Sequence, residues 1–513
     1  MLGVSETDSR ERGQADPSAG GYITVYLALT IAAALSLYLV LIRGARLGAA
    51  KMQMESICRI SQNAALAEFH QELHRRYDLF FIDTSYGGTG GGNEVLGMHL
   101  RRYMEKNCER KYVLPFGGKR DWTSMETGDV RVTQTRYACD QRGQAVREQV
   151  YAYMAADPAG AAAAAFLASA DQWRGLEISG RDWAQETHKS EEDLKEALRN
   201  KREEQREENE EKDENEEEVT SEEREAASDK PSEAEEMVSQ VESFQFLPIL
   251  MQVFGNFDGL SNERIDGKGS LCGRGLHMGD GLSVPNSHKY PAADEILFDR
   301  YISEKTGNCA KPLGDGRLRY QQEYILCGKE SDRENLEGTA ARLILIREAS
   351  NCGYLFSDEE KMAKISFVAM AASLILLNPE LEEPMSRAIA LAWAYLESVQ
   401  DVRTLMTGGR VPLVKTAQSW QTGLHELLTP LTAIRDRDSG EGLDYGEYLQ
   451  GLLLLEGSSV KTQRTMDVME MDIRKITGNS SFRFDLCLDG FGMHAEAQAC
   501  GKSFQFDGEC GYN

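Results

Sequence analysis

Basic residues are scarce relative to acidic ones in this sequence. Its 513 residues include 57 Lys and Arg against 83 Asp and Glu, which gives a formal net charge of −26. A protein that binds nucleic acid neutralises phosphates with clustered Lys and Arg. The composition therefore argues against a nucleic-acid-binding protein.

Paired cysteine motifs are also missing. The ten cysteines are irregularly spaced and none forms a CxxC pair, so zinc-ribbon and thioredoxin-like proteins have no support. The even count would suit disulfides outside the cell. Free and mostly buried thiols explain the same spacing equally well, so both interpretations stay open.

The motifs of common catalytic and cofactor sites are absent as well. His70 and His74 are one turn apart in HQELH, but the Glu stands at the third position, so the general base of HExxH is missing. The glycine-rich segment SYGGTGGGN at 85–93 matches neither GxxxxGK[ST] nor GxGxxG, and we expect a flexible connection there. No GxSxG occurs. We therefore predict no catalytic residues, no cofactor-binding residues, no metal ligands and no enzymatic activity.

One long apolar run stands out against these absences. Tyr22–Ile42, YITVYLALTIAAALSLYLVLI, has 21 residues without a charge. At about 1.5 Å per residue a helix of this length spans roughly 30 Å, the thickness of a bilayer core. We predict a transmembrane helix at 22–42 in a single-pass protein with nearly all its mass on one side.

The residues before this run are polar and differ from a secretory signal. Residues 1–21 form a short leader in which Arg10 and Arg12 stand beside acids, without a positive n-region. The apolar run is longer than a signal h-region, and Gly44-Ala45-Arg46 is only a poor match to the A-x-A cleavage site of a signal peptide. A retained anchor is therefore favoured over a cleaved signal sequence.

Charge alone leaves the orientation of the anchor open. Arg43, Arg46, Lys51 and Arg59 follow the span, and by the positive-inside rule they favour a C-terminal side in the cytoplasm. The rule is weak for long translocated domains.

Residues 43–175 are predicted to hold a stalk helix and the first part of an outer body. From Arg43 to about Asp83 there is no Pro, and apolar residues recur at helical spacing, which predicts one continuous helix from Tyr22 to about Tyr77. Asp129–Cys139 is predicted to be a strand with Val130 and Val132 on one face.

An acidic low-complexity region follows at residues 176–242. It includes KREEQREENEEKDENEEEV and has few large apolar residues with which to bury a core. We expect an insertion, a charged linker or an exposed helical spacer.

Residues 243–513 read as a mainly helical domain. Ser331 begins one helix, and Ser357 with Glu360 forms a capping box for the next. The apolar stretch Ile365–Leu377 is too short to span a membrane and predicts a buried core helix. Partial alternation in Phe482–Leu488 and Met493–Phe506 predicts a terminal β-hairpin that carries Cys487 and Cys500. The fold class expected for the whole chain is α+β, mainly α.

The anchor and the stalk together carry a family resemblance. GYITVYLALTIAAALSLYLVLIRGAR and AALAEFHQELHRRYDLFFIDTSYG resemble the opening of TadE/TadG-like, Flp-pilus-associated membrane proteins of Gram-positive bacteria. The C-terminal region resembles the uncharacterised domain that accompanies this opening. The segments that carry the second resemblance are LRYQQEYILCGKESDRENL, RLILIREASNCGYL, AWAYLESVQDVRTLMTGGRVPLVKT, LDYGEYL and MDVMEMDIR.

The resemblance implies an N-terminus in the cytoplasm and a C-terminal body outside the cell membrane. In related pilin-like subunits a peptidase cuts after a glycine, and a Glu five residues on recruits the next subunit. The matching glycine is Gly21, whose fifth following residue is Tyr26 instead of Glu. Processing and filament incorporation are therefore open at this point.

Three functions are weighed on these grounds. The first is a non-enzymatic, membrane-anchored envelope protein, pseudopilin-like or accessory to a Tad/Flp-type pilus or secretion apparatus. Its partners would be the membrane through 22–42 and other pilus or envelope subunits, with no nucleic acid and no small-molecule substrate. Membrane positions that could contact another helix are Thr24, Tyr26, Thr30, Ser36 and the small residues Ala32–Ala34.

The second function is a membrane-anchored extracellular binding or sensing module. Its aromatic segments would be Tyr445–Tyr448 and Phe482–Phe484, although core packing explains them too. The third and least favoured is an ectoenzyme with a carboxylate pair such as Asp332 and Glu334.

Overall fold

The computed structural model describes residues 17–88, 90–108, 112–113, 119–120, 125–155, 170–213, 232–267, 269–283, 291–437 and 440–512. Most of the predicted leader and the acidic residues 214–231 lie outside this set. The chain forms two compact units. Unit 1 takes residues from 1–68, 92–135 and 490–511, and unit 2 takes residues from 69–91, 136–489 and 512–513. Each unit therefore draws on both predicted ranges, 43–175 and 243–513.

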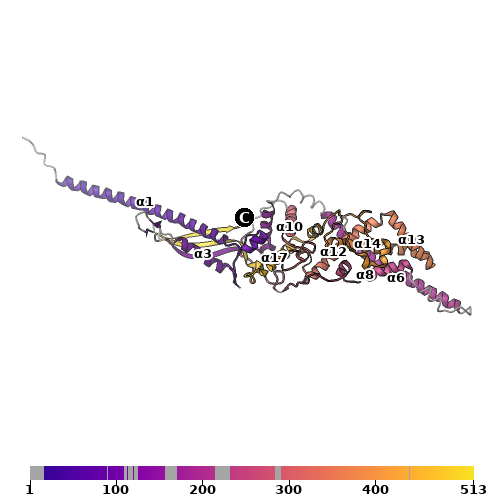
Figure 1. The fold of residues 1–513 in the computed structure, drawn as a ribbon. Helices are drawn as coiled ribbons and strands as arrows, with labels where there is room; N and C mark the ends of the chain where they lie inside the picture. Colours follow the sequence, from indigo (N-terminus) through magenta and orange to yellow (C-terminus); the bar gives the residue numbers. More distant parts are fainter. Residues whose placement is uncertain are drawn as a thin grey trace, which may run out of the picture. The chain divides into compact units, whose positions relative to one another are not determined.

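Unit 1 combines a long N-terminal helix with a small antiparallel sheet (Figure 1). Its elements are α1 (Pro17–Leu66), α3 (Asn93–Cys108), β2 (Tyr112–Val113), β3 (Lys119–Arg120) and most of β4 (Glu126–Tyr137), β5 (Cys487–Ala499) and β6 (Lys502–Gly511). Strand β5 is central, with β4 on one side and β6 on the other. The predicted strand near 129–139 and the presence of a C-terminal hairpin are confirmed. The strands of the hairpin differ from the prediction, because residues 489–492, expected between the two strands, lie inside β5.

The hairpin turn explains the register of β5 and β6. Ala499 pairs with Lys502, so only Cys500 and Gly501 form the loop. Both have positive φ, 53° and 72°, as a two-residue turn that matches the twist of the strands requires. In β5 the buried side chains then alternate with more exposed ones from Met493 to Ala499.

The stalk helix is shorter than predicted. Helix α1 is continuous from Pro17 but ends at Leu66, and α2 (Gln71–Tyr77) is a separate helix of unit 2. Between them the chain becomes extended, because Phe69 bridges Ile82 and the His70 amide donates to the Phe81 carbonyl at 2.8 Å. The imidazole Nδ1 of His70 then caps α2 by accepting from the Leu73 amide.

Unit 2 is mainly helical. Its further elements are β1 (Ile82–Asp83), η1 (Asp140–Arg142), α4 (Gln144–Ala155), α6 (Ala170–Asp213), α8 (Glu233–Gln245), α9 (Ile249–Phe254), α10 (Pro291–Lys305), α11 (Gln321–Cys327), α12 (Asp332–Leu355), α13 (Glu359–Ile375), η2 (Pro379–Leu381), α14 (Glu382–Met406), η3 (Leu424–Leu428), α15 (Pro430–Ala433), α16 (Tyr445–Leu455), α17 (Ser458–Lys475) and η4 (Phe484–Leu486). The mainly helical α+β class is confirmed.

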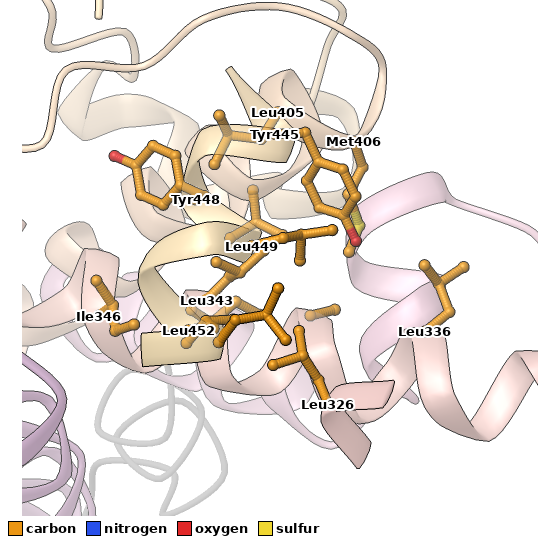
Figure 2. Packing of buried hydrophobic residues seen from close by; sticks show 14 of the residues in the cluster. Leu326, Leu336, Leu343, Ile346, Leu405, Met406, Tyr445, Tyr448, Leu449 and Leu452 are labelled. Carbon is orange, nitrogen blue, oxygen red and sulfur yellow. The ribbon is translucent and has the colours of Figure 1, made fainter. Parts of the chain in front are cut away.

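Helices α12 and α14 form the centre of unit 2. Most of α14 is buried, and its neighbours are α6, α8, α12 and α13. Leu343 and Ile346 of α12 belong to the same core as Leu449 and Leu452 of α16 (Figure 2). The segments that carry the resemblance to the uncharacterised domain therefore lie largely in this core.

The first part of the acidic range differs from the linker that was expected. Residues up to Asp213 continue α6, and Trp173, Thr187 and Leu194 are buried on one side of this helix. Gly180 permits a close helix crossing, because a Cβ there would lie 2.0 Å from the Leu345 carbonyl oxygen of α12. A helix can pack on the body with few apolar residues when these recur on one face and a glycine lets its backbone approach the neighbouring helix.

Two expectations about α13 are wrong. The N-cap is Asp358, whose side chain accepts from the Lys361 amide, so Ser357 does not form the predicted capping box. The helix is also not a buried core helix, because only Ile365, Ala369, Ala372 and Ser373 are buried on it.

Candidate functional site

The first half of α1 has the properties of a membrane span. Among the described residues, α1 is the one helix long and apolar enough to cross a bilayer, and the apolar window is entirely exposed. Every residue from Gly21 to Ile42 is exposed. A run of large apolar side chains without protein neighbours requires an apolar environment.

The predicted polar contact positions of this span are satisfied within the helix. Thr24, Thr30 and Ser36 each donate to a carbonyl three residues earlier, at 2.8–2.9 Å. Their hydroxyl donors are therefore engaged inside α1. Tyr26 is exposed.

The second half of α1 is part of the core of unit 1. Buried residues recur on one side, including Ala50, Met54, Ile57 and Ala65, and this face packs on α3 and β6. Gln62 Nε2 donates to the Gly508 carbonyl at 3.0 Å, which fixes the helix to β6.

The end of α1 is fixed by a carboxylate. Glu68 accepts a hydrogen bond from the Tyr103 hydroxyl and faces His99 Nδ1 at 3.2 Å, and both partners belong to α3. One continuous helix thus joins an exposed apolar segment to a packed segment without a hinge.

The other residues singled out in the sequence have structural roles. His74 stacks on Phe80 with ring centroids 4.2 Å apart, and His70 caps α2. Asp332 is buried and accepts from the Ser261 hydroxyl and the Arg319 amide, so it does not pair with Glu334 as an acid–base couple. Among the described residues no cluster of His, Cys, Asp or Glu could hold a metal ion.

The two aromatic segments of the binding-module hypothesis are buried. Tyr445 donates to Glu323, and Tyr448 packs edge-on against Trp173. Phe482 and Phe484 are buried as well. Core packing therefore explains all four side chains, and they offer no binding surface.

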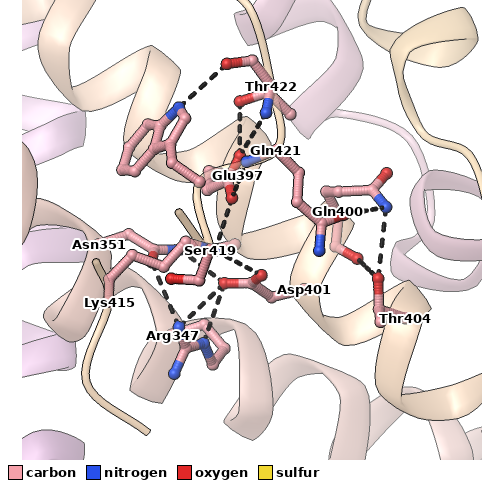
Figure 3. Close-up of polar contacts among 12 residues, drawn as sticks. Arg347, Asn351, Glu397, Gln400, Asp401, Thr404, Lys415, Ser419, Gln421 and Thr422 are labelled. Atoms are coloured by element: carbon pink, nitrogen blue, oxygen red, sulfur yellow. Dashed lines mark hydrogen bonds and ion pairs between the residues drawn. The ribbon is translucent and has the colours of Figure 1, made fainter. Parts of the chain in front are cut away.

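One group of buried charges in unit 2 is a closed network, defined here as Arg347, Glu397, Asp401 and Lys415. All four side chains are fully buried. Arg347 lies 3.0 Å from Asp401, and Lys415 lies 2.7 Å from Asp401 and 2.5 Å from Glu397 (Figure 3). Two cations and two anions balance one another.

The charge network fixes one segment of backbone onto α12 and α14. Arg347 donates to the Pro412 and Leu413 carbonyls at 2.9 Å each, while Glu397 accepts from the Gln421 and Thr422 amides at 2.8 Å each. Burial alone would raise the pKa of Asp401, but Lys415 and Arg347 outweigh it and hold that pKa below its usual value. A buried network with its hydrogen bonds satisfied specifies a conformation.

Two other buried carboxyls have no balancing basic partner among the residues that the structure describes. Burial raises the pKa of Glu323 to about 7, although the Cys309 amide and the Tyr445 hydroxyl donate to it. Burial also raises the pKa of Glu348 to about 7, against a hydrogen bond from Thr187 and with a further rise from Glu191. Shifted carboxyls often mark functional sites, but these two lie on different helices, each with its own partners.

Sequence reasoning missed the charge network, although a signal was present. Glu397 and Asp401 are four residues apart on a helix whose neighbouring positions are apolar, so both acids face the core side. Acids at that spacing on an apolar face require buried bases, and Arg347 and Lys415 lie within the quoted family segments.

The ten cysteines are free thiols in the structure, at buried, intermediate and exposed positions. Burial raises the pKa of Cys58 to about 12, so this side chain favours the neutral thiol. Of the two interpretations of the cysteines, the structure therefore agrees with free thiols.

Comparison with known proteins defines the class of this chain. The model of the family of unknown function DUF5702 matches residues 227–499, which is more than half of the sequence. The chain belongs to this family. No curated protein and no solved structure matches it. The matched range covers α8 to β5 and does not include α1, so it concerns the helical body.

Proposed function

We propose that the protein is a non-enzymatic, membrane-anchored envelope protein, a pseudopilin-like or accessory component of a Tad/Flp-type pilus or secretion apparatus. The observation that carries the proposal is α1, whose exposed apolar half continues without a break into a half packed on α3 and β6. A helix built this way holds a folded unit at a fixed distance from a bilayer.

The N-terminus would lie in the cytoplasm and the body outside the cell. This orientation rests on the resemblance of the anchor and stalk to TadE/TadG-like proteins. A retained anchor is supported by the continuity of α1, because the apolar segment shares its helix with residues of the unit 1 core, such as Met54 and Ile57.

A role without catalysis is supported by the placement of the ionisable groups. The charge network has no exposed side chain, and Asp332 is occupied by structural hydrogen bonds. These groups stabilise the body, which would present its surfaces to partner subunits.

The test is protease shaving of intact cells that make the full chain with a tag at each end. Loss of the C-terminal tag, with a retained fragment that still begins at Met1, supports an uncleaved anchor and an external body. A mature N-terminus at Tyr22 would support pilin-like processing after Gly21. A C-terminal tag that is protected until lysis would place the body in the cytoplasm and overturn the proposal.

Shearing of the same cells separates a filament subunit from an accessory protein. A subunit incorporated into a filament is released with the sheared material. An accessory protein held by α1 stays with the membrane fraction, which is the outcome that an unprocessed Gly21 and the Tyr26 position favour.

A further inference from the structure

The outer face of α13 is apolar, although it is not covered by the rest of unit 2. We define this outer face by Ala363, Phe367, Met370, Leu374, Ile375 and Leu377. Phe367 is 67%, Leu374 63% and Leu377 80% exposed. The part of α13 from Ile365 to Ile375 has no charged residue on any side. A helix of this kind is usually buried or in a membrane. Its exposure on one side marks an interaction surface.

A hollow widens the outer face on one flank. It measures about 500 Å³ and is lined by Ala363, Lys364, Phe367, Val368 and Leu424, with Glu360 at its edge. Lys364 is held by Glu360 at 2.7 Å, so it does not cover the apolar side chains. This hollow can receive a large apolar side chain of a partner.

The opposite flank of α13 is acidic. A second hollow, of about 510 Å³, is lined by Met362, Ser366, Pro379 and Ser386 together with Glu380, Glu382, Glu383 and Arg387. Arg387 is engaged by Glu186 of α6 at 2.6 Å. Among the described residues, Glu380, Glu382 and Glu383 have no ion pair, so three carboxylates remain for a basic partner.

The charges discriminate between possible occupants. A lipid surface is disfavoured, because charged side chains are costly inside a bilayer and the acidic flank adjoins the apolar face. A second copy of this chain is disfavoured because the start of α13 has Asp358, Glu359 and Glu360 against two lysines, and its other end has Glu380, Glu382 and Glu383. Parallel and antiparallel pairing would both bring net negative ends together.

We propose that the outer face of α13 binds a basic amphipathic helix of a partner protein. The apolar side of that helix would cover Phe367, Met370 and Leu374. Its Lys and Arg side chains would pair with Glu380, Glu382 and Glu383. Such helix-in-groove contacts combine apolar anchors with charges at the rim, and the charges determine which partner is accepted.

The experiment is site-specific photocrosslinking in cells that naturally make the full chain. The photoreactive residue benzoylphenylalanine replaces Leu374 in one variant and Val414, an exposed apolar residue outside α13, in the control. We expect a protein adduct from position 374 and none from position 414. Mass spectrometry should place the crosslink in a partner segment with apolar residues at helical spacing and Lys or Arg on the other face.

A charge-neutral variant tests the acidic flank. Glu380→Gln, Glu382→Gln and Glu383→Gln together should reduce the adduct from position 374 by about tenfold. The matched control is Glu192→Gln, Asp193→Asn and Glu196→Gln on the exposed side of α6, which removes the same charge and should leave the adduct unchanged. Circular dichroism of each purified variant checks that its helical content is retained.

Each other outcome overturns the proposal. An adduct of two copies of this chain would make the outer face a self-association surface, and an adduct with lipid alone would make it a membrane contact. A partner segment without basic residues, an adduct that the three Gln substitutions leave unchanged, or no adduct at position 374 would also contradict it. The outcome does not depend on the pilus assignment, because the surface belongs to unit 2 alone.

Discussion

At the scale of single residues, unit 2 contains buried charges that are balanced and buried charges that are not. Lys415 lies between Glu397 and Asp401, and Arg347 completes the balance. Glu323 and Glu348 are also buried, and no base in the described part of the chain compensates them. The two situations predict opposite responses to substitution.

Loss of Lys415 should be strongly destabilising. Lys415→Met removes one partner and leaves Glu397 and Asp401 with only Arg347, so we expect the free energy of unfolding to fall by about 3–5 kcal/mol. The measurement is chemical denaturation of the full chain in lipid nanodiscs, followed by circular dichroism. Arg387→Met is the control, because this exposed partner of Glu186 should contribute at most about 1 kcal/mol. Equal losses in both variants would contradict a structural role of the charge network.

Neutralising Glu348 should stabilise the protein above pH 7. The pKa of this carboxyl rises from 4.5 to about 7 on folding, so between these values the folded state binds more protons than the unfolded state. The free energy of unfolding must therefore fall as pH rises through this window. At pH 8 the ionised Glu348 lowers the free energy of unfolding by roughly 3 kcal/mol, and Glu348→Gln should restore this amount. At pH 4.5 the substitution should have little effect on stability.

Thermal unfolding at both pH values measures the effect of this substitution. Glu192→Gln, on the exposed side of α6, serves as the control and should not change the pH dependence. Glu191, whose pKa burial also raises to about 7, faces Glu348 from α6 and retains part of the pH dependence in the variant. A Glu348→Gln protein with the wild-type pH profile would show that the pKa of Glu348 does not rise on folding.

At the scale of elements, α1 has two halves with different requirements. The first half is exposed and apolar, and the second half is packed on α3 and β6. Ala34→Arg with Leu35→Arg should therefore prevent membrane insertion, because each Arg near the centre of a span costs about 2.5–3.5 kcal/mol. Extraction of membranes with alkaline carbonate, followed by detection of the chain in the pellet, measures this.

The matched control for this prediction lies beyond the span on the same helix. Met52→Arg with Ser56→Arg adds the same two charges at exposed positions outside 22–42. This variant should stay in the carbonate-resistant pellet. If the Ala34/Leu35 variant remained there too, membrane association would have to come from another part of the chain.

The elements also show why some predictions from sequence succeed. The N-cap residue Ser331 located the start of α12. Alternation indicated the strand β4 and the terminal hairpin, because β4 and β5 each have a buried face. The end of α1 was missed because Phe69 and His70 pair with the chain at 81–82, a contact between segments that periodicity does not report. The prediction that α13 is a buried core helix was wrong, because an apolar stretch has the same composition whether it faces a core or a partner.

At the scale of the whole molecule, each unit is assembled from distant parts of the sequence. Unit 1 joins the N-terminal helix to strands near the C-terminus, and the buried Gln62–Gly508 contact is one of its links. The periodicity of apolar residues within one segment does not predict this division into two units, because the division depends on which distant segments meet after folding. The spacing of Glu397 and Asp401 is a local signal, but the pairing of these acids with Arg347 and Lys415 joins separate segments and does not follow from local pattern.

The whole molecule should be stable without oxidation. All ten cysteines are free, and the core of unit 2 is built from apolar packing and the charge network. A structural disulfide typically contributes about 2–4 kcal/mol, so its reduction would lower the unfolding temperature measurably. We expect the thermal unfolding of the full chain in nanodiscs to be the same with and without a reducing agent. A lower unfolding temperature under reducing conditions would show that cysteines pair outside the cell, and the free thiols would then describe only the reduced protein.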